Sequence, residues 1–289
     1  MQTEAITRAM RAAVSIAAEL KLAVDDAHVV HNSNNLALRL RPCDVFARVA
    51  HIGQEVARFE IDLAQRLAEA ECPVAGLEPR VPPRVYERDG FAITFWTYYE
   101  TVESRTVSPG DYASSLERLH AGMRTLAVEA PHFTDRVAEA QHLVAQRDLT
   151  PSLIDPDRDL LGRALRSATR AIGQRSAREQ LLHGEPHPGN VLNTKNGLRF
   201  IDLETCCRGP VEFDLAHVPE AVVDRYAGAD RELLADCRLL VLAMVAAWRC
   251  DRTDQFPDGE RARRALLGAL REGPPWPALD VVMRPPDDS

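Results

Sequence analysis

The sequence predicts an α+β protein, with a small β-rich region followed by a larger, mostly helical one. In the first region, β-prone residues flank the turn Asn32–Asn35, whose asparagines tolerate left-handed backbone geometry. Segments Arg84–Arg88 and Phe91–Trp96 indicate a hairpin, because Asp89-Gly90 between them favours a tight two-residue turn. From Ser108 onwards, apolar residues recur mainly at helical spacing.

The chain changes character at Thr97–Val107, so we place a boundary near Tyr99–Arg105. We expect residues 1–99 to form an N-terminal lobe with a leading helix, and residues 100–289 a helical lobe. The expected helices are Ala5–Leu20, Gln54–Ala70, Pro109–Leu126 capped by Ser108, Phe133–Gln146, Arg158–Gly173, Arg231–Cys250 and Gly259–Arg271. The other expected strands are Val29–His31, Leu36–Leu40, Val45–Val49, Val191–Thr194 and Leu198–Asp202, and the proline-rich tail Pro274–Ser289 is expected to be extended or partly disordered.

The composition is that of an ordinary soluble globular protein, with 45% hydrophobic and 27% charged residues among 289. A formal net charge of −8 argues against general nucleic-acid binding, which needs a basic face. The longest apolar stretch, Leu239–Trp248, is too short to span a membrane, and Met1–Glu19 lacks the pattern of a signal peptide. The six cysteines are scattered without metal-ligand spacing. We therefore expect a cytoplasmic protein with reduced thiols and with neither membrane nor nucleic-acid partners, and the sequence predicts no particular oligomeric state.

Acids and amides gather in one stretch, Leu181–Ala216. Asn190 and Asp202 offer the hard oxygen ligands that Mg²⁺ prefers. Glu185 could accept a proton from a substrate hydroxyl, and His183 is a second candidate base. The loop from His183 to Asn190 contains Gly184, Pro186, Pro188 and Gly189, which favour a single fixed loop shape.

Two motifs in this stretch carry a family resemblance. Residues 183–190, His-Gly-Glu-Pro-His-Pro-Gly-Asn, resemble the catalytic-loop motif H-G-D-x-x-x-x-N of the aminoglycoside phosphotransferase and choline kinase group. Residues 200–204, followed by Arg208-Gly209-Pro210 and Asp214-Leu215-Ala216, resemble the metal-binding segment of that group. The resemblance covers residues 25–250 and implies a bilobal protein-kinase-like fold, with the N-terminal lobe binding a nucleotide.

The resemblance implies a role for each matching residue in transfer of phosphate from ATP. Glu185 matches the catalytic base, and Asn190 and Asp202 match the two Mg²⁺ ligands, with the metal neutralising phosphate charge. Arg48 matches the strand lysine that contacts the ATP phosphates, and Glu60, with Glu55 as the alternative, matches the ion-pair partner of that lysine. Trp96–Tyr99 match the hinge segment, where Thr97, Tyr98 and Tyr99 would bind adenine through their backbone. His183 and Asp214 match residues that would support the loop.

Three departures from the family pattern bear on activity. Glu185 stands where the family has Asp, and one extra methylene could shift the acceptor by about an ångström. Arg48 replaces Lys but keeps the charge and can grip phosphate with two N–H groups. The turn Asn32–Asn35 lacks the glycines of a phosphate-covering loop. A slow enzyme or a nucleotide-binding pseudokinase is therefore one alternative.

The preferred hypothesis is an ATP-dependent kinase that phosphorylates a hydroxyl of an aminoglycoside or another cationic antibiotic. The rival acceptor is a small hydroxylated metabolite such as a sugar, an amino alcohol or a choline-like compound. The acids Asp251, Asp254, Asp258 and Glu260 could line a pocket for a cation, although acids at the start of a helix also stabilise it with no ligand. His187 is expected to be a loop or substrate-side residue rather than the base.

Overall fold

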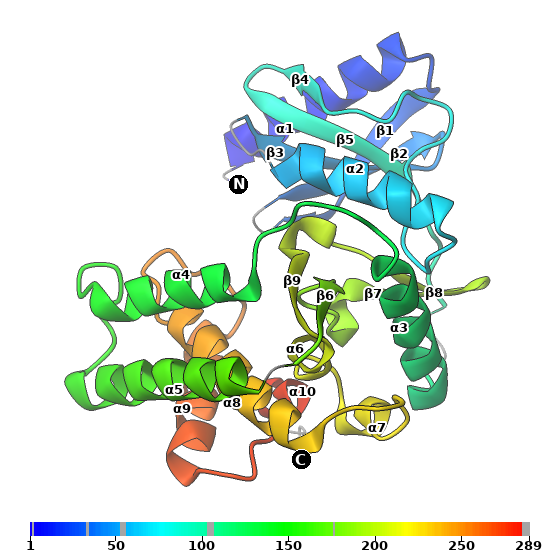
Figure 1. The fold of residues 1–289 in the computed structure, drawn as a ribbon. Coiled ribbons are helices and arrows are strands. Elements are labelled where there is room, and N and C mark those ends of the chain that lie inside the picture. Colours follow the sequence, from blue (N-terminus) through cyan, green and yellow to red (C-terminus); the bar gives the residue numbers. More distant parts are fainter. Residues whose placement is uncertain (2, 33–34, 53–55, 103–106, 176, 285–289) are drawn as a thin grey trace. The chain divides into compact units, whose positions relative to one another are not determined.

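The computed structural model of the protein describes residues 1, 3–32, 35–52, 56–102, 107–175 and 177–284. It confirms the α+β class and contains two compact units (Figure 1). Unit 1 comprises Met1–Thr106 and Leu192–Glu204, and unit 2 comprises Val107–Val191 and Thr205–Ser289. The second motif of the central stretch therefore begins in unit 1, whereas the first lies in unit 2. None of the described helices is long and apolar enough to cross a membrane.

Unit 1 is built on one antiparallel sheet with strand order β1-β2-β3-β5-β4. Side chains alternate between its two faces, so Val45, Ala47 and Val49 are buried on one face, where they pack into a core with α1. The other face of β3 carries Arg48 and meets α2, whose Glu60 contacts Arg48 (Figure 1). The elements are α1 (Thr3–Glu19), β1 (Val24–Asn32), β2 (Leu36–Pro42), β3 (Val45–His51), α2 (Val56–Glu69), β4 (Tyr86–Arg88) and β5 (Phe91–Thr97).

A hairpin of β7 (Val191–Thr194) and β8 (Gly197–Phe200) leads towards Asp202. The predicted Asn196-Gly197 turn forms, with Gly197 at φ 97°. Phe200 is fully buried and exchanges backbone hydrogen bonds with Pro73 and Ala75 at 2.8 and 2.9 Å, which attaches the hairpin to unit 1.

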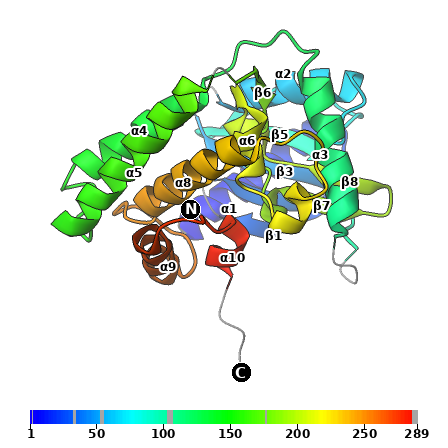
Figure 2. The ribbon, with the colours of Figure 1, turned by 60° about the horizontal axis from the view of Figure 1, so that its bottom comes forward.

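Unit 2 is organised around α8 (Arg231–Trp248), which packs against helices on several sides. Figure 2 shows α4 and α5 alongside it. Ser108 caps α3 as predicted, accepting from Asp111 N–H at 3.4 Å, and Pro109 is the first helical residue. The other elements are α3 (Pro109–Met123), α4 (Phe133–Ala145), α5 (Asp155–Gln174), β6 (Glu179–Leu182), β9 (Cys207–Pro210), α6 (Val211–Leu215), α7 (Glu220–Val223), α9 (Gly259–Glu272) and α10 (Leu279–Met283), with a 3₁₀ turn at Pro188–Asn190. A second 3₁₀ turn, Leu203–Thr205, lies within the second motif.

Three sequence-based expectations are wrong or incomplete. The strand predicted over Leu198–Asp202 ends at Phe200, because Asp202 adopts φ 67°, which no strand accommodates. Strands β6 and β9 were not expected, since β9 contains Gly-Pro and the two strands pair across the loop and hairpin between them. The tail is not wholly extended: α10 forms where buried Leu279 packs and Arg261 donates to the Met283 carbonyl at 2.9 Å. Ser33, Asn34, Gln54 and Glu55 lie outside the described residues.

Candidate functional site

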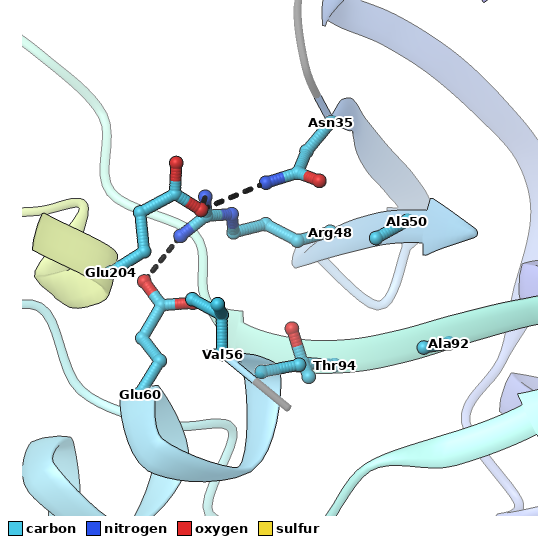
Figure 3. Close-up of a pocket in the computed structure, with 9 residues that line it drawn as sticks. Asn35, Arg48, Ala50, Val56, Glu60, Ala92, Thr94 and Glu204 are labelled. Atoms are coloured by element: carbon cyan, nitrogen blue, oxygen red, sulfur yellow. Dashed lines mark hydrogen bonds and ion pairs between the residues drawn. The ribbon is translucent and has the colours of Figure 1, made fainter. Parts of the chain in front are cut away.

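Arg48 of β3 lies at the centre of a charged cluster in unit 1 (Figure 3). Its Nη1 contacts Oε1 of Glu60, and its Nη2 lies 2.9 Å from Asp202 Oδ1 and 3.1 Å from Glu204 Oε2. Glu60 also accepts the backbone N–H of Leu203 at 3.2 Å. The cluster thus combines side chains from strand β3, helix α2 and the segment after β8.

Three carboxylates face one guanidinium in this cluster, so its charge is unbalanced. Burial raises the pKa of Glu60 to about 7. Arg48 acts in the opposite direction, but the carboxylates of Asp202 and Glu204 offset part of its effect. Burial by itself lowers the pKa of Arg48, but attraction by Glu60, Asp202 and Glu204 raises it overall. Arg48 therefore remains cationic, and the surplus negative charge favours a further cation nearby.

A small pocket opens beside Arg48, lined by Asn35, Arg48, Ala50, Val56, Ala57, Glu60, Ala92, Thr94 and Glu204 (Figure 3). The small side chains of Ala50 and Ala92 on adjacent strands leave this space open. Asn35 Nδ2 donates to Glu204 Oε2 at 3.1 Å. Asn35 Oδ1 is buried and has no hydrogen-bond partner among the described residues.

The predicted hinge follows directly from β5. Thr97 donates its backbone N–H to Gly76 O at 2.9 Å, so this group is already engaged. The ring of Tyr98 lies 4.0 Å from the guanidinium of Arg39, and the Tyr99 hydroxyl accepts from Gly76 N–H at 3.1 Å. Both tyrosine side chains are thus held within unit 1.

Asp202 has a backbone conformation that L-residues rarely adopt, with φ 67°. Such conformations persist where the surrounding structure enforces them, and they are frequent at functional sites. Its carboxylate is 31% exposed and is held by Arg48. The carboxylate is therefore presented at the surface of unit 1 in a defined orientation.

In unit 2, the loop after β6 is fixed by a fully buried carboxylate. Asp214 accepts the backbone N–H groups of His183 and Gly184 at 2.9 and 2.8 Å, and His120 Nε2 lies 2.9 Å from it. Since a carboxylate only accepts, His120 Nε2 carries the proton, and its Nδ1 faces the Tyr226 hydroxyl at 2.8 Å. Burial raises the pKa of Asp214, but its hydrogen bond from His120 and the nearby histidines outweigh burial and lower it.

The far side of the loop is held by Tyr112 of α3, which donates to the Pro186 carbonyl at 2.5 Å. Within the loop, the Glu185 carbonyl accepts from His187 N–H at 2.8 Å and from Asn190 Nδ2 at 3.0 Å. The hydrogen bond from Asn190 Nδ2 orients the amide of Asn190 and leaves its Oδ1 as the atom that could ligate a metal.

The carboxylate of Glu185 pairs with Arg136 of α4, through Oε1 and Nη2. Burial would raise the pKa of Glu185, but the guanidinium of Arg136 outweighs burial and holds it below the usual value. The nearby His217 is buried, donates Nδ1–H to the Phe213 carbonyl at 2.9 Å, and burial lowers its pKa to about 4. Glu185 is therefore ionised at neutral pH, whereas His217 is neutral.

The two histidines considered as bases make contacts that support the loop. His183 is fully buried, and its Nδ1 accepts from Glu185 N–H at 3.4 Å. His187 Nδ1 accepts from Gly189 N–H at 3.1 Å and caps the 3₁₀ turn before Asn190. Neither contact favours proton transfer over a structural role.

The donors that could hold a metal are oxygen atoms from two residues. Among the described residues no group of three or more His, Cys, Asp and Glu side chains could hold a metal ion. Mg²⁺ is often bound through one or two side chains, while phosphates and water complete its shell. Asp202 and Asn190 fit this donor chemistry, each within its own unit.

The structure brings several predicted residues together within each unit. Arg48, Glu60 and Asp202 form one cluster in unit 1, and Glu185 and Asn190 share one loop in unit 2. Glu55, the alternative to Glu60, lies outside the described residues. Sequence reasoning did not assign roles to Glu204, His120, Arg136 and His217. His120 lies on the buried face of α3 with Leu116 and Met123, which is the one signal that could have revealed it.

The fold and these clusters define a phosphotransferase of the kinase type. Residues 30–249 match the family model described as the phosphotransferase enzyme family, and the chain belongs to that family. This confirms the resemblance in the central motifs. No curated protein matches the sequence.

Solved structures of similar fold share little sequence with the chain. The amicoumacin kinase hAmiN in complex with AMP-PNP, Ca²⁺ and Ami has a TM-score of 0.70 at 12% identity, covering 96% of this chain and 98% of that one. A choline/ethanolamine kinase family protein from Mesorhizobium loti has a TM-score of 0.62 at 16% identity, with 93% and 98% covered. The GDP and kanamycin complex of APH(2")-IIia has a TM-score of 0.65 at 14% identity, with 90% and 95% covered. At such identities these similarities establish the fold alone.

Proposed function

We propose that the protein transfers the γ-phosphoryl group of ATP to a hydroxyl group of a small molecule. The observation that carries this proposal is the contact of Arg48 with both Glu60 and Asp202, since it unites a strand cation, its helix partner and a candidate metal ligand. The ordered loop that presents Glu185 and Asn190 in unit 2 supports it independently.

Each residue has one task in the proposed reaction. Arg48 binds the ATP phosphates and is kept in place by Glu60, while the backbone at Thr97, Tyr98 and Tyr99 receives the adenine. Asn190 and Asp202 are the residues that would hold Mg²⁺, and a bound Mg²⁺ would supply positive charge for the phosphates. Glu185 orients the acceptor hydroxyl and takes its proton, while the hydroxyl oxygen attacks the γ-phosphorus in line and the bond to the leaving ADP oxygen breaks. We place this kinase in the cytoplasm, where cysteines stay reduced, because its six cysteines are scattered without disulfide or metal-ligand spacing.

Two classes of acceptor are candidates. A similar structure was solved with kanamycin, which supports a hydroxyl of an aminoglycoside or another cationic antibiotic, and hence a role in antibiotic resistance. Another belongs to the choline/ethanolamine kinase family, which supports a small hydroxylated metabolite. Of the acids that could attract a cation, Asp254 is paired with Arg249 at 3.2 Å, and Asp251 accepts from Thr253 N–H at 2.8 Å. Both carboxylates are therefore already engaged within the protein, which gives no support for a role in binding a cationic acceptor.

Nucleotide binding and ATP consumption test the proposal in two steps. ATP with Mg²⁺ should raise the melting temperature, because a ligand that binds only the folded state stabilises it. ATP consumption is then screened over aminoglycosides, peptide antibiotics and small hydroxylated metabolites. No thermal shift at millimolar nucleotide would refute the proposal, and binding without turnover on any acceptor would favour a nucleotide-binding pseudokinase.

The Glu185→Ala variant separates chemistry from nucleotide binding. It should lose transfer while its affinity for ATP stays close to that of the wild type, because Glu185 lies in unit 2 and the Arg48 cluster lies in unit 1. Transfer that persists in Glu185→Ala would instead point to His183 or His187 as the base.

A further inference from the structure

Arg136 is the residue that holds the carboxylate of Glu185. It lies at the end of the first turn of α4, beside the buried side chains Phe133 and Val137. Its Nη2 pairs with Oε1 of Glu185, and the side chains of the two residues are 18% and 21% exposed. A partly buried ion pair of this kind defines the position of both groups more tightly than a surface pair does.

Arg136 is itself held by a second helix. Its guanidinium lies 4.7 Å from the ring centroid of Trp248, the last residue of α8, and α4 packs against α8. A guanidinium stacked on an indole ring is attracted by the ring and loses mobility before it binds a carboxylate. The cation beside Glu185 is therefore fixed by α4 and α8.

The length of the Glu185 side chain matters for this contact. The backbone of Glu185 is tied down, because its carbonyl accepts from His187 N–H at 2.8 Å and from Asn190 Nδ2 at 3.0 Å. The side chain alone then determines where the carboxylate lies. An aspartate at the same position would end about 1.5 Å earlier, the length of one C–C bond, and would fall short of Arg136.

We propose that Arg136 is a positioning residue that holds Glu185 in the orientation in which it meets the acceptor hydroxyl. This inference rests on the proposed phosphotransfer. Arg136 binds Oε1, and the second carboxylate oxygen, Oε2, receives the hydrogen bond of the hydroxyl. Glu185 and Arg136 thus form one functional pair, and glutamate at position 185 is the residue that fits this loop.

Steady-state ATP consumption by the full chain with Mg²⁺ tests the pair. The acceptors are water, which is present in every assay, and any compound returned by the screen. Arg136→Met keeps the approximate side-chain length but removes the charge. Arg136→Lys keeps the charge but removes the planar guanidinium group. Glu185→Asp keeps the carboxylate but shortens the side chain. The control is Arg271→Met, because Arg271 also forms an ion pair between two helices, with Asp157 of α5, although its side chain is 53% exposed.

We expect Arg136→Met and Glu185→Asp each to lower kcat about a hundredfold, the loss typical of an ångström-scale displacement at a reacting centre. The KM for ATP should stay within about twofold, since ground-state binding of the nucleotide is unchanged. Combining the two substitutions should cost no more than either alone, because both break the same contact. Arg136→Lys should recover part of kcat, and Arg271→Met should keep the wild-type kcat.

Four results would overturn the inference while leaving the proposed function intact. They are an Arg136→Met variant with wild-type kcat, a Glu185→Asp variant faster than the wild type, losses that multiply in the double variant, and an equal loss of kcat in Arg271→Met. Circular dichroism and thermal melting identify a variant that fails to fold, and Arg136→Lys then decides the question. A wild-type chain that consumes no ATP with any acceptor or with water refutes the proposed function itself.

Discussion

Arg48 and Asp202 form an ion pair within unit 1, with Nη2 of the arginine 2.9 Å from Oδ1 of the aspartate. The strand cation is thus bound directly to the carboxylate predicted to ligate a metal. Because the same guanidinium also contacts Glu60 and Glu204, a single cation faces three carboxylates. Removing that cation should therefore affect folding as well as nucleotide binding.

Arg48→Met should destabilise the protein by about 3 kcal/mol, the typical effect of leaving a buried charge without its partner. Arg48 and Glu60 are only 17% and 5% exposed, so solvent screens this pair little. Urea unfolding at about pH 8, above the raised pKa of Glu60, measures the loss. The double variant Arg48→Met/Glu60→Gln should recover part of the stability, because it removes the stranded carboxylate. Equal destabilisation of the single and double variants would contradict this explanation.

The chemistry of the site could be predicted from the sequence because it depends on local motifs. The loop from His183 to Asn190 and the turn at Asp202 contain their own glycines, prolines and polar side chains. The partner of Arg48 could also be proposed, since Glu60 lies on the next helix. Arg136 could not be predicted as the partner of Glu185, because the two residues are 49 positions apart and meet only through the packing of unit 2.

The fold was predictable where a periodic pattern was long enough. Helices such as α8 and hairpins such as β4–β5 occur close to their expected bounds. The four-residue strands β6 and β9 escaped prediction because their pairing, Leu182 opposite Cys207, joins segments separated by the loop and hairpin. The helix α10 depends on contacts with α9 that no local pattern in a proline-rich tail can reveal.

Asp214→Asn should loosen the loop that presents Glu185. An amide oxygen accepts less strongly than a carboxylate, and its NH₂ group would oppose one of the three donors that now face Asp214. We expect a loss of about 2 kcal/mol, in the range for one buried donor left unsatisfied, together with a lower kcat. Hydrogen exchange at the amides of His183 and Gly184 provides the direct measurement. Unchanged protection of both amides would show that Asp214 does not fix the loop.

Gly184→Ala should destabilise the protein far more than Gly197→Ala, although the two glycines have similar φ angles. Gly184 has φ 91°, and an added Cβ would lie 2.0 Å from the Thr205 carbonyl oxygen. Gly197 is the matched control, because it has φ 97° but no atom within 4 Å of its Cβ position. Gly197→Ala should cost about 1 kcal/mol from backbone strain alone, and Gly184→Ala several times as much by thermal or urea unfolding. Similar losses in the two variants would mean that the loop moves away from Thr205 without difficulty.

His217 should make unit 2 less stable in mild acid. Burial lowers its pKa to about 4, below the value of about 6.5 for an unfolded histidine, so folding favours the neutral ring. Its contribution to stability is present above about pH 6.5, is lost as the pH falls towards 4, and amounts to about 3 kcal/mol for a shift of this size.

His217→Asn tests this contribution, because asparagine can still donate to the Phe213 carbonyl but cannot be protonated. The stability difference between wild type and variant, measured by urea unfolding from about pH 7 to about pH 4.5, should shift in favour of the variant as the pH falls. Taking the difference at each pH isolates His217 from Glu60, whose raised pKa makes its own contribution fall as the pH rises from about 4.5 to about 7. A difference that does not change with pH would show that His217 is not held neutral by its surroundings.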